Sequence, residues 1–157
     1  MLRILTLCHG NICRSPLAEV LIEAAINADP HLRGRVAVSS AGTSSEHAGE
    51  GMHVNSAAIL SARGLRTAHR ARLFTPAIAA THDLVLAADQ ANLRNGRDII
   101  RMAARQPEIR LIRDFDPAAA GRDLDDPWGY PPTEYERTAA EIATAIPGLL
   151  AELRDRI

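Results

Sequence analysis

Continuous runs of apolar residues alternate along the chain with segments in which apolar residues recur every three or four positions. The runs that begin near residues 2, 35, 82 and 108 are short and apolar, which is typical of buried strands. Segments 16–27, 54–62 and 92–104 have the spacing of helices. Buried strands that alternate with helices indicate an α/β fold. We predict a three-layer sandwich with a central four-stranded parallel sheet and helices on both faces, of the Rossmann-like kind.

Several helix ends carry local signals. Ser15 followed by Pro16 predicts an N-cap and a first helical residue, and Thr75 before a proline predicts another short helix. Residues 133–136 read TEYE, which fits a capping box. The spacing behind it predicts a docked C-terminal helix, in which Pro147 is expected to cause a kink or a restart. The apolar positions of that helix are Tyr135, Ile142, Ile146, Leu149, Leu150 and Leu153.

Length and charge describe an ordinary globular protein. At 157 residues, the chain is expected to form a single domain spanning 1–157, large enough to bury a hydrophobic core. The net charge is −1 and the 18 basic residues are all arginines, scattered along the chain, which gives no support for nucleic-acid or membrane-surface binding. No apolar run approaches the roughly 20 residues of a membrane span. The first run is too short for a signal peptide, so a cytoplasmic location is expected, while export by another route stays open.

The loop between the first strand and the first helix, residues 8–14, has the features of an anion site. In parallel sheets ligands bind beyond the carboxyl ends of the strands, where this loop lies. Free N–H groups and the dipole of a helix N-terminus attract negative charge. Gly10 and Asn11 tolerate the left-handed backbone that turns successive amides toward one centre. Arg14 adds a planar fork for two phosphate oxygens, and the absence of Gly-Lys-Ser/Thr rules out a Walker-type loop.

Cys8 lies where such an anion would sit. The positive field that binds a phosphate also stabilises a thiolate. A thiolate beneath a phosphate cradle is a nucleophile directed at phosphorus, and Arg14 would then stabilise the oxygens of the transition state. Cys8 and Cys13 are the only cysteines, too few for a disulfide framework and not spaced as metal ligands.

Five segments, in order along the chain, resemble the low-molecular-weight protein tyrosine phosphatases. The first, CHGNICRSP from Cys8, contains the family signature Cys-x5-Arg-Ser. The other four are SSAGT at 39–43, HRARLFTP at 69–76, DLVLAADQANLR at 83–94 and DDPWG at 125–129. Cys-x5-Arg alone is a weak signal, so the identification depends on all five segments, which together extend the similarity over essentially the whole chain.

The resemblance implies a mechanism and partners. Cys8 would be the nucleophile that forms a phosphocysteine, and Arg14 would bind the phosphate. Asp126 would protonate the leaving oxygen and later activate water, since a phenolate leaving group needs a proton. The chemistry requires no metal and no organic cofactor. The implied partners are a phosphorylated protein or a small phosphoester as substrate and inorganic phosphate as product, with no nucleic acid and no membrane, in a monomer or weak dimer.

The resemblance also implies how the loop is held. Ser15 would donate a hydrogen bond to the Cys8 sulfur and favour the thiolate. Asn11 would keep the loop in shape through Ser40 and His69. The phosphate-binding loop itself would consist of His9, Gly10, Asn11, Ile12, Cys13, Arg14 and Ser15.

The residues expected at the pocket rim depart from the family pattern. Where the family usually has an aromatic residue after SAGT, this chain has Glu46, followed by His47. Trp128 stands where a tyrosine often follows Asp-Pro, then a glycine, with Tyr130 one step later. Trp128 could still stack on a substrate ring, whereas Glu46 would oppose acidic peptides. His9 should also point toward this rim. Because the usual aromatic residue is missing, the sequence supports phosphatase chemistry more strongly than it supports phosphotyrosine as the substrate.

Several alternatives stay open. Cys13 is either a small apolar filler or a disulfide partner that protects oxidised Cys8. Asp89 follows the third strand near the site but has no assigned role. Phosphoarginine phosphatases of this family carry threonine where Ile12 stands, and its bulk argues for an oxygen-linked ester. Arsenate reductases of similar fold use further cysteines, which this chain lacks, and a catalytically silent phosphate-binding module is the remaining alternative.

Overall fold

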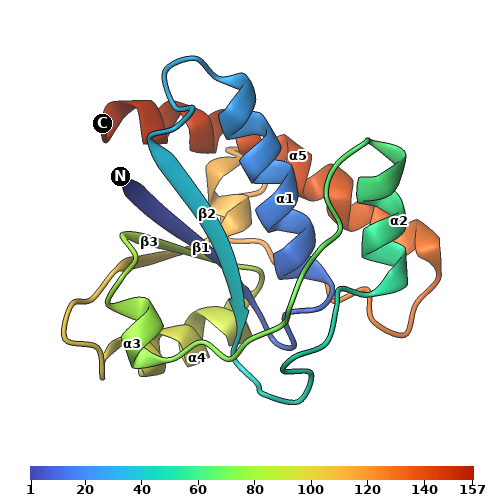
Figure 1. The fold of residues 1–157 in the computed structure, drawn as a ribbon, viewed down its shortest axis with the longest axis horizontal. Helices are drawn as coiled ribbons and strands as arrows, with labels where there is room; N and C mark the ends of the chain where they lie inside the picture. Colours follow the sequence, from blue (N-terminus) through green and yellow to red (C-terminus); the bar gives the residue numbers. More distant parts are fainter.

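The computed structural model describes all residues, 1–157, and contains the predicted four-stranded sheet (Figure 1). Every pair of neighbouring strands is parallel, and their order across the sheet is β2-β1-β3-β4. The strands are β1 (Leu2–Cys8), β2 (Val36–Gly42), β3 (Leu84–Ala87) and β4 (Glu108–Leu111). The predicted α/β architecture is therefore confirmed.

Helices cover both faces of the sheet, which gives the three predicted layers (Figure 1). One core joins the sheet to α1, α2 and α5, and a second core joins it to α3 and α4. None of the helices combines the length and apolar character needed to cross a bilayer. Their bounds are α1 (Arg14–Ala28), α2 (Val54–Ala62), α3 (Pro76–Ala79), α4 (Gln90–Ile100), the 3-10 helix η1 (Ile112–Phe115) and α5 (Pro132–Asp155).

The apolar run of the central strand β1 reflects burial on both faces of the sheet. Ile4 and Cys8 belong to the core shared with α1 and α5, whereas Leu5 and Leu7 belong to the core on the opposite face. Side chains of a strand alternate between faces, so a strand buried on both sides is apolar at nearly every position, and Thr6 is the one buried polar residue of β1. Because β1 lies between β2 and β3, the loop that follows Cys8 emerges in the middle of the carboxyl edge of the sheet.

The start of α1 differs from the prediction. The helix begins at Arg14 with Cys13 as the N-cap residue, so Ser15 is the second helical residue instead of the cap. Ser15 is fully buried, and its hydroxyl contacts the Cys8 sulfur and the Asn11 side chain. Because the Ser15 side chain is bonded within the preceding loop, it is not available to cap the helix, and α1 begins without a side-chain cap.

Other helix ends also differ. α5 begins at Pro132 without a side-chain cap, because the ring of a proline presets the first helical φ, so the predicted capping box at 133–136 is wrong. α5 then continues as one helix through Pro147, without the expected restart. α4 begins two residues earlier than predicted, at Gln90, because the Asp89 carboxylate accepts a hydrogen bond from the Asn92 N–H and caps it.

Candidate active site

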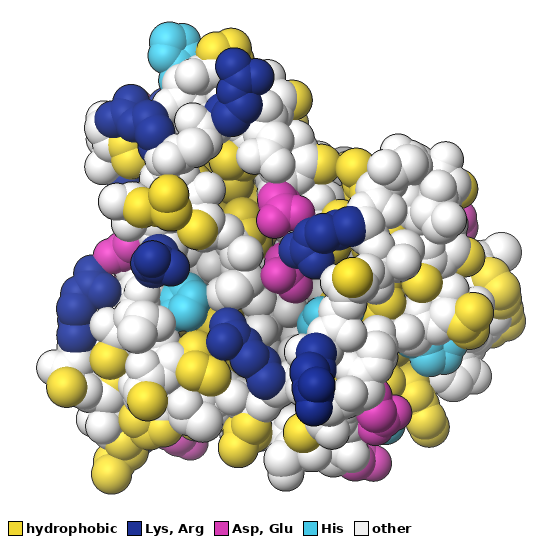
Figure 2. Space-filling model, in the orientation of Figure 1, with side chains coloured by type: hydrophobic (Ala, Val, Ile, Leu, Met, Phe, Trp, Pro, Cys, Tyr) yellow, Lys and Arg dark blue, Asp and Glu magenta, His cyan; other side chains and the backbone are white.

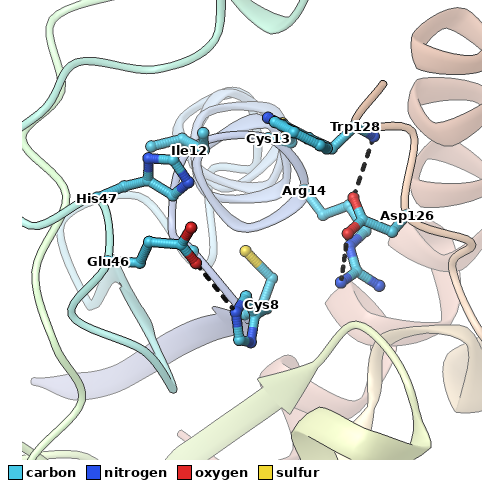
Figure 3. Close-up of a pocket in the computed structure, with 10 residues that line it drawn as sticks. Cys8, Ile12, Cys13, Arg14, Glu46, His47, Asp126 and Trp128 are labelled. Atoms are coloured by element: carbon cyan, nitrogen blue, oxygen red, sulfur yellow. Dashed lines mark hydrogen bonds and ion pairs between the residues drawn. The ribbon is translucent and has the colours of Figure 1, made fainter. Parts of the chain in front are cut away.

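The loop from Cys8 to Arg14 curls around the sulfur of Cys8 (Figure 3). Asn11 is the one non-glycine residue with a positive φ, 57°, and its N–H points at the Cys8 sulfur, 3.3 Å from nitrogen to sulfur. Gly42, at the end of β2, lets the loop approach closely, since a Cβ there would lie 2.6 Å from the His9 carbonyl oxygen. The backbone conformation expected of an anion-binding loop is therefore present.

Asn11 is the centre of the hydrogen bonds that hold the loop. Its Nδ2 donates to Ser15 Oγ at 2.8 Å and to Ser40 Oγ at 3.0 Å, and its Oδ1 accepts from the Arg72 N–H at 3.0 Å. His69 Nε2 lies 2.6 Å from the Asn11 carbonyl oxygen. The structure thus places Ser40 and His69 against Asn11, as predicted, and adds Arg72.

The direction of these bonds orients the serine toward the sulfur. Ser15 Oγ lies 3.0 Å from Cys8 Sγ. Because Ser15 already accepts a hydrogen bond from Asn11, its single hydroxyl proton is free to be donated to sulfur. Ser40 Oγ in turn donates to the buried Glu19 Oε2 at 2.6 Å, so it has the same acceptor role toward Asn11. The hydrogen bonds of Asn11 and Ser15 therefore direct two donors, the Asn11 N–H and the Ser15 hydroxyl, at the Cys8 sulfur.

Arg14 is buried at the pocket wall, with 2% of the residue exposed. Its Nη1 donates to Asp89 Oδ2 and to the Leu124 carbonyl oxygen, each at 2.7 Å. Burial alone would lower the pKa of Arg14, but the Cys8 sulfur and Asp89 outweigh burial, so the pKa lies above its ordinary value. The guanidinium therefore stays charged. Nη1 is occupied by Asp89 and the Leu124 carbonyl, so Nη2 is the nitrogen that lies beside Asp126 at the pocket (Figure 3).

Asp126 lies above the sulfur on the loop that precedes α5. One carboxylate oxygen accepts a hydrogen bond from the Trp128 N–H at 3.1 Å, and the other lies 3.9 Å from Arg14 Nη2. Its side chain is about half exposed, 52%, so solvent reaches it. The neighbouring Asp125 points elsewhere, to Arg137. Only the second carboxylate of the pair therefore lines the pocket with Cys8.

The predicted rim is present with one exception. Glu46 and His47 line the pocket across from Trp128, and His9 Nε2 lies 3.7 Å from Glu46 Oε2 (Figure 3). Tyr130 is exposed and does not line the pocket, so its placement on the rim is wrong. The turn at Pro127 carries the chain away after Trp128, with the Tyr130 N–H bonded back to the Pro127 carbonyl.

Cys13 also lines the pocket, but its surroundings differ from those of Cys8. Both cysteines are buried free thiols. The Cys13 sulfur lies 3.5 Å from the hydroxyl oxygen of Tyr135, in α5. Burial raises the pKa of Cys13 to about 11, and the bond with Tyr135 lowers it only in part. Cys13 is therefore a neutral thiol at pH 7.

Several site contacts were not predicted because they join distant parts of the chain. Asp89 contacts Arg14 across 75 positions, and the Leu124 carbonyl does so across 110. Glu19, one turn into α1, accepts from Ser40. The only local signal was that of Asp89, a carboxylate directly after a buried strand and before a helix. A carbonyl partner such as that of Leu124 leaves no sequence signal at all.

The fold and the pocket together define a class: an α/β protein with a cysteine at the base of an oxyanion loop, an arginine at its wall and a carboxylate at its mouth. Residues 3–157 match the family model described as low molecular weight phosphotyrosine protein phosphatase. The chain belongs to that family.

Individual relatives agree with this assignment. A low molecular weight protein-tyrosine-phosphatase of Streptomyces coelicolor is 37% identical over 157 residues, which covers 99% of this chain and 95% of the relative. The crystal structure of YfkJ from Bacillus subtilis superposes with a TM-score of 0.88 at 27% identity, covering 99% of this chain and 96% of the other. A Drosophila arginine phosphatase shares the fold, with a TM-score of 0.86, 22% identity and coverage of 96% of each chain.

Proposed function

We propose that this chain hydrolyses phosphate monoesters, with protein phosphotyrosine as the favoured substrate, through a phosphocysteine intermediate. The observation that carries the proposal is the arrangement of Cys8, Arg14 and Asp126 around one pocket (Figure 3). A nucleophile, an oxyanion clamp and a proton donor are the three parts that the reaction needs.

The first step transfers the phosphoryl group to the protein. The loop N–H groups and Arg14 bind the phosphate oxygens, and the Cys8 thiolate attacks phosphorus as the bond to the leaving oxygen breaks. Asp126 gives its proton to that oxygen, so the alcohol leaves neutral. The Ser15 hydroxyl, 3.0 Å from the sulfur, is placed to stabilise the negative charge of the attacking group.

The second step returns the enzyme to its starting state. Asp126, now ionised, takes a proton from a water molecule, which attacks phosphorus and displaces the Cys8 sulfur. Inorganic phosphate leaves, with Cys8 again a thiolate and Asp126 again protonated. The half-exposed position of Asp126 supports both tasks, because it can face either a bound ester or water.

The walls of the pocket support an aromatic ester. Trp128 lies on one side, and Ile12 and His47 lie on the other, which leaves room for a flat ring between them (Figure 3). Ile12 lines the pocket where phosphoarginine phosphatases of this family carry threonine, and its greater bulk supports an oxygen-linked phosphate over phosphoarginine. Glu46, at the mouth, disfavours acidic groups next to the phosphorylated residue.

The partners and location follow from this proposal. The substrate is a phosphorylated protein or small phosphoester, and the product is inorganic phosphate. Nucleic acid and membrane have no role in it. The protein works in the cytoplasm as a monomer or weak dimer, and Cys13 is available as a redox partner of Cys8 because both thiols face one pocket.

The decisive experiment is hydrolysis of p-nitrophenyl phosphate in EDTA by the wild type and three variants. Cys8→Ser should lose activity by about 10⁴-fold or more, and Asp126→Asn should lose about 10²-fold. Asp125→Asn is the matched control, because that carboxylate is adjacent but bonded to Arg137, and it should stay within about twofold.

Each outcome separates the alternatives. Full activity in Cys8→Ser would exclude the thiolate mechanism. An inactive wild type that still binds phosphate would favour a silent phosphate-binding module. Peptides that carry phosphotyrosine, phosphoserine or phosphoarginine then rank the substrates, and faster turnover of phosphoarginine would overturn the choice of an oxygen ester.

A further inference from the structure

We propose that a groove separate from the catalytic pocket binds an anion of the phosphate class. The groove lies between α1, the edge strand β2 and the segment 66–72, on the face shown in Figure 2. Dark-blue arginine side chains and two acidic side chains surround a hollow on this face (Figure 2). The residues that matter are Glu19, Ser40, Arg66, His69, Arg70 and Arg72.

The positive charge of the groove is not balanced. Arg66 is fully engaged, since it donates to Glu19, to Glu23 and to a backbone carbonyl. It thereby neutralises acidic charge that would otherwise repel an anion. Arg70 makes no side-chain hydrogen bond or ion pair, and Arg72 uses only Nε, on the Ser40 carbonyl oxygen at 3.0 Å. Two guanidinium groups therefore present free donors to the same hollow.

The backbone that carries these two arginines is fixed. The Arg72 N–H donates to Asn11 Oδ1, and the Arg72 carbonyl accepts from the Gly42 N–H at 2.9 Å. Between the two arginines, the Ala71 N–H donates to the Glu50 carbonyl at 2.8 Å. Arginines on a backbone anchored on both sides lose less freedom on binding than arginines on a mobile loop.

The chemistry of the lining selects the kind of ligand. Guanidinium groups bind the oxygens of phosphate through paired N–H donors. Ala68 is the one apolar residue of the groove, and the His69 ring is buried and bonded to the Asn11 carbonyl, so little apolar or aromatic surface is free to stack on a nucleobase. A bare phosphate group, free or attached to a partner side chain, fits this lining better than a nucleotide.

The groove shares residues with the supports of the catalytic loop. Ser40 and His69 contact Asn11 from this side, and the Arg72 N–H does so as well. Arg72 would therefore contact the anion through its side chain, while its own backbone N–H donates to the Asn11 side chain that supports the catalytic loop. This inference does not depend on the proposed reaction, since the groove does not include Cys8, Arg14 or Asp126.

The test is an NMR titration of the full-length protein with pyrophosphate, following backbone N–H and arginine Nε–H signals. Signals of residues 69–72 should saturate at a different concentration from those of the catalytic loop, 9–15. Arg70→Ala should weaken the first event about fivefold or more, and leave the second unchanged. Arg63→Ala is the matched control, an exposed arginine near the same segment that does not line the groove, and it should change neither event.

A parallel titration with N-acetyl-phosphoserine amide identifies the source of the phosphate. Saturation by pyrophosphate alone assigns the groove to a free anion, and saturation by both assigns it to a phosphorylated partner as well. The proposal is overturned if residues 69–72 do not saturate, or if they follow the same curve as the catalytic loop in the wild type and in Arg70→Ala. Equal weakening by Arg63→Ala would also overturn it, because it would show general charge screening.

Discussion

The base and the rim of the catalytic pocket are built in opposite ways. At the base, Asn11, Arg14 and Ser15 are buried, and each has two or more hydrogen-bond partners. At the rim, more than half of the side chain is exposed in Glu46 and Trp128, and the polar contacts are few. Substitutions at the base should therefore change the chemistry, whereas substitutions at the rim should change the choice of substrate.

Among the residues that support Cys8 at the base, the largest effect is expected from Arg14→Lys. Lysine keeps the charge but loses the planar fork, so it cannot serve Asp89, the Leu124 carbonyl and a phosphate at once. We expect kcat for p-nitrophenyl phosphate to fall about 10²–10³-fold. Arg113→Lys is the control, since Arg113 is a largely buried arginine paired with Glu141 away from the pocket.

This control should keep its kcat within about twofold of the wild type. If Arg14→Lys retains more than a tenth of the activity, a single positive charge is enough and the fork at the base is not needed. Urea unfolding of both variants separates loss of chemistry from loss of fold.

A smaller effect at the base is expected from Ser15→Ala. Removal of the hydroxyl leaves the Cys8 sulfur without one hydrogen-bond donor, so the negative charge of the attacking sulfur is less well stabilised. The rate at which iodoacetate alkylates Cys8 and the value of kcat/KM, both measured at pH 6, should each fall about tenfold. Ser56→Ala is the control, because Ser56 is equally buried but donates to the Cys13 carbonyl.

An unchanged alkylation rate in Ser15→Ala would mean that the loop amides and Arg14 alone stabilise the sulfur. An equally reduced rate in Ser56→Ala would instead indicate a general loosening of the loop, because Ser56 donates to the Cys13 carbonyl and not to Cys8.

Cys13 allows the effect of burial at the base to be measured as a pH dependence of stability. Burial raises the pKa of Cys13 to about 11, above the ordinary 9.0 of a thiol. The folded state therefore holds a proton that the unfolded state loses between those values, so stability is full below about pH 9 and falls as pH rises toward 11. The loss should be about 2–3 kcal/mol.

The measurement is the free energy of unfolding in urea at several pH values between 8.5 and 11. Cys13→Ala should flatten the decline, whatever its effect on stability at pH 8. An equally steep decline in this variant would assign the pH dependence to other groups, such as Tyr135, whose pKa burial also raises.

The base of the pocket also shows which parts of the site could be predicted from the sequence. The base is one contiguous loop between a strand and a helix, so Cys8, Asn11 and Arg14 could be placed from local signals. What local signals could not supply were the partners that reach this loop from elsewhere. Asp89 and the Leu124 carbonyl come from segments whose approach depends on the packing of the whole sheet.

The helix ends show that tertiary contacts can override a local sequence signal. Ser15 has the signature of an N-cap, but its hydroxyl is bonded within the Cys8 loop, and the helix begins two residues earlier than predicted, at Arg14. The resemblance of the Asp-Pro segment to the family pattern predicts Tyr130 on the rim, yet Tyr130 follows the turn at Pro127, is exposed and does not line the pocket. Position in a sequence predicts a loop better than it predicts where a side chain on that loop points.

The smallest effect, and the one that tests the rim, is expected from Glu46→Gln. Glu46 is exposed and has one loose contact, with His9 at 3.7 Å, so its charge acts on the substrate through solvent and is partly screened. We expect the ratio of KM values for phosphotyrosine peptides with flanking glutamates and with flanking arginines to fall about three- to fivefold, with kcat nearly unchanged. Glu50→Gln is the control, since that carboxylate is paired with His47 and does not line the pocket. An effect that disappears at 0.5 M salt would confirm an electrostatic origin, whereas a change in kcat instead of KM would show that the rim takes part in the chemistry and would break the division between the two regions.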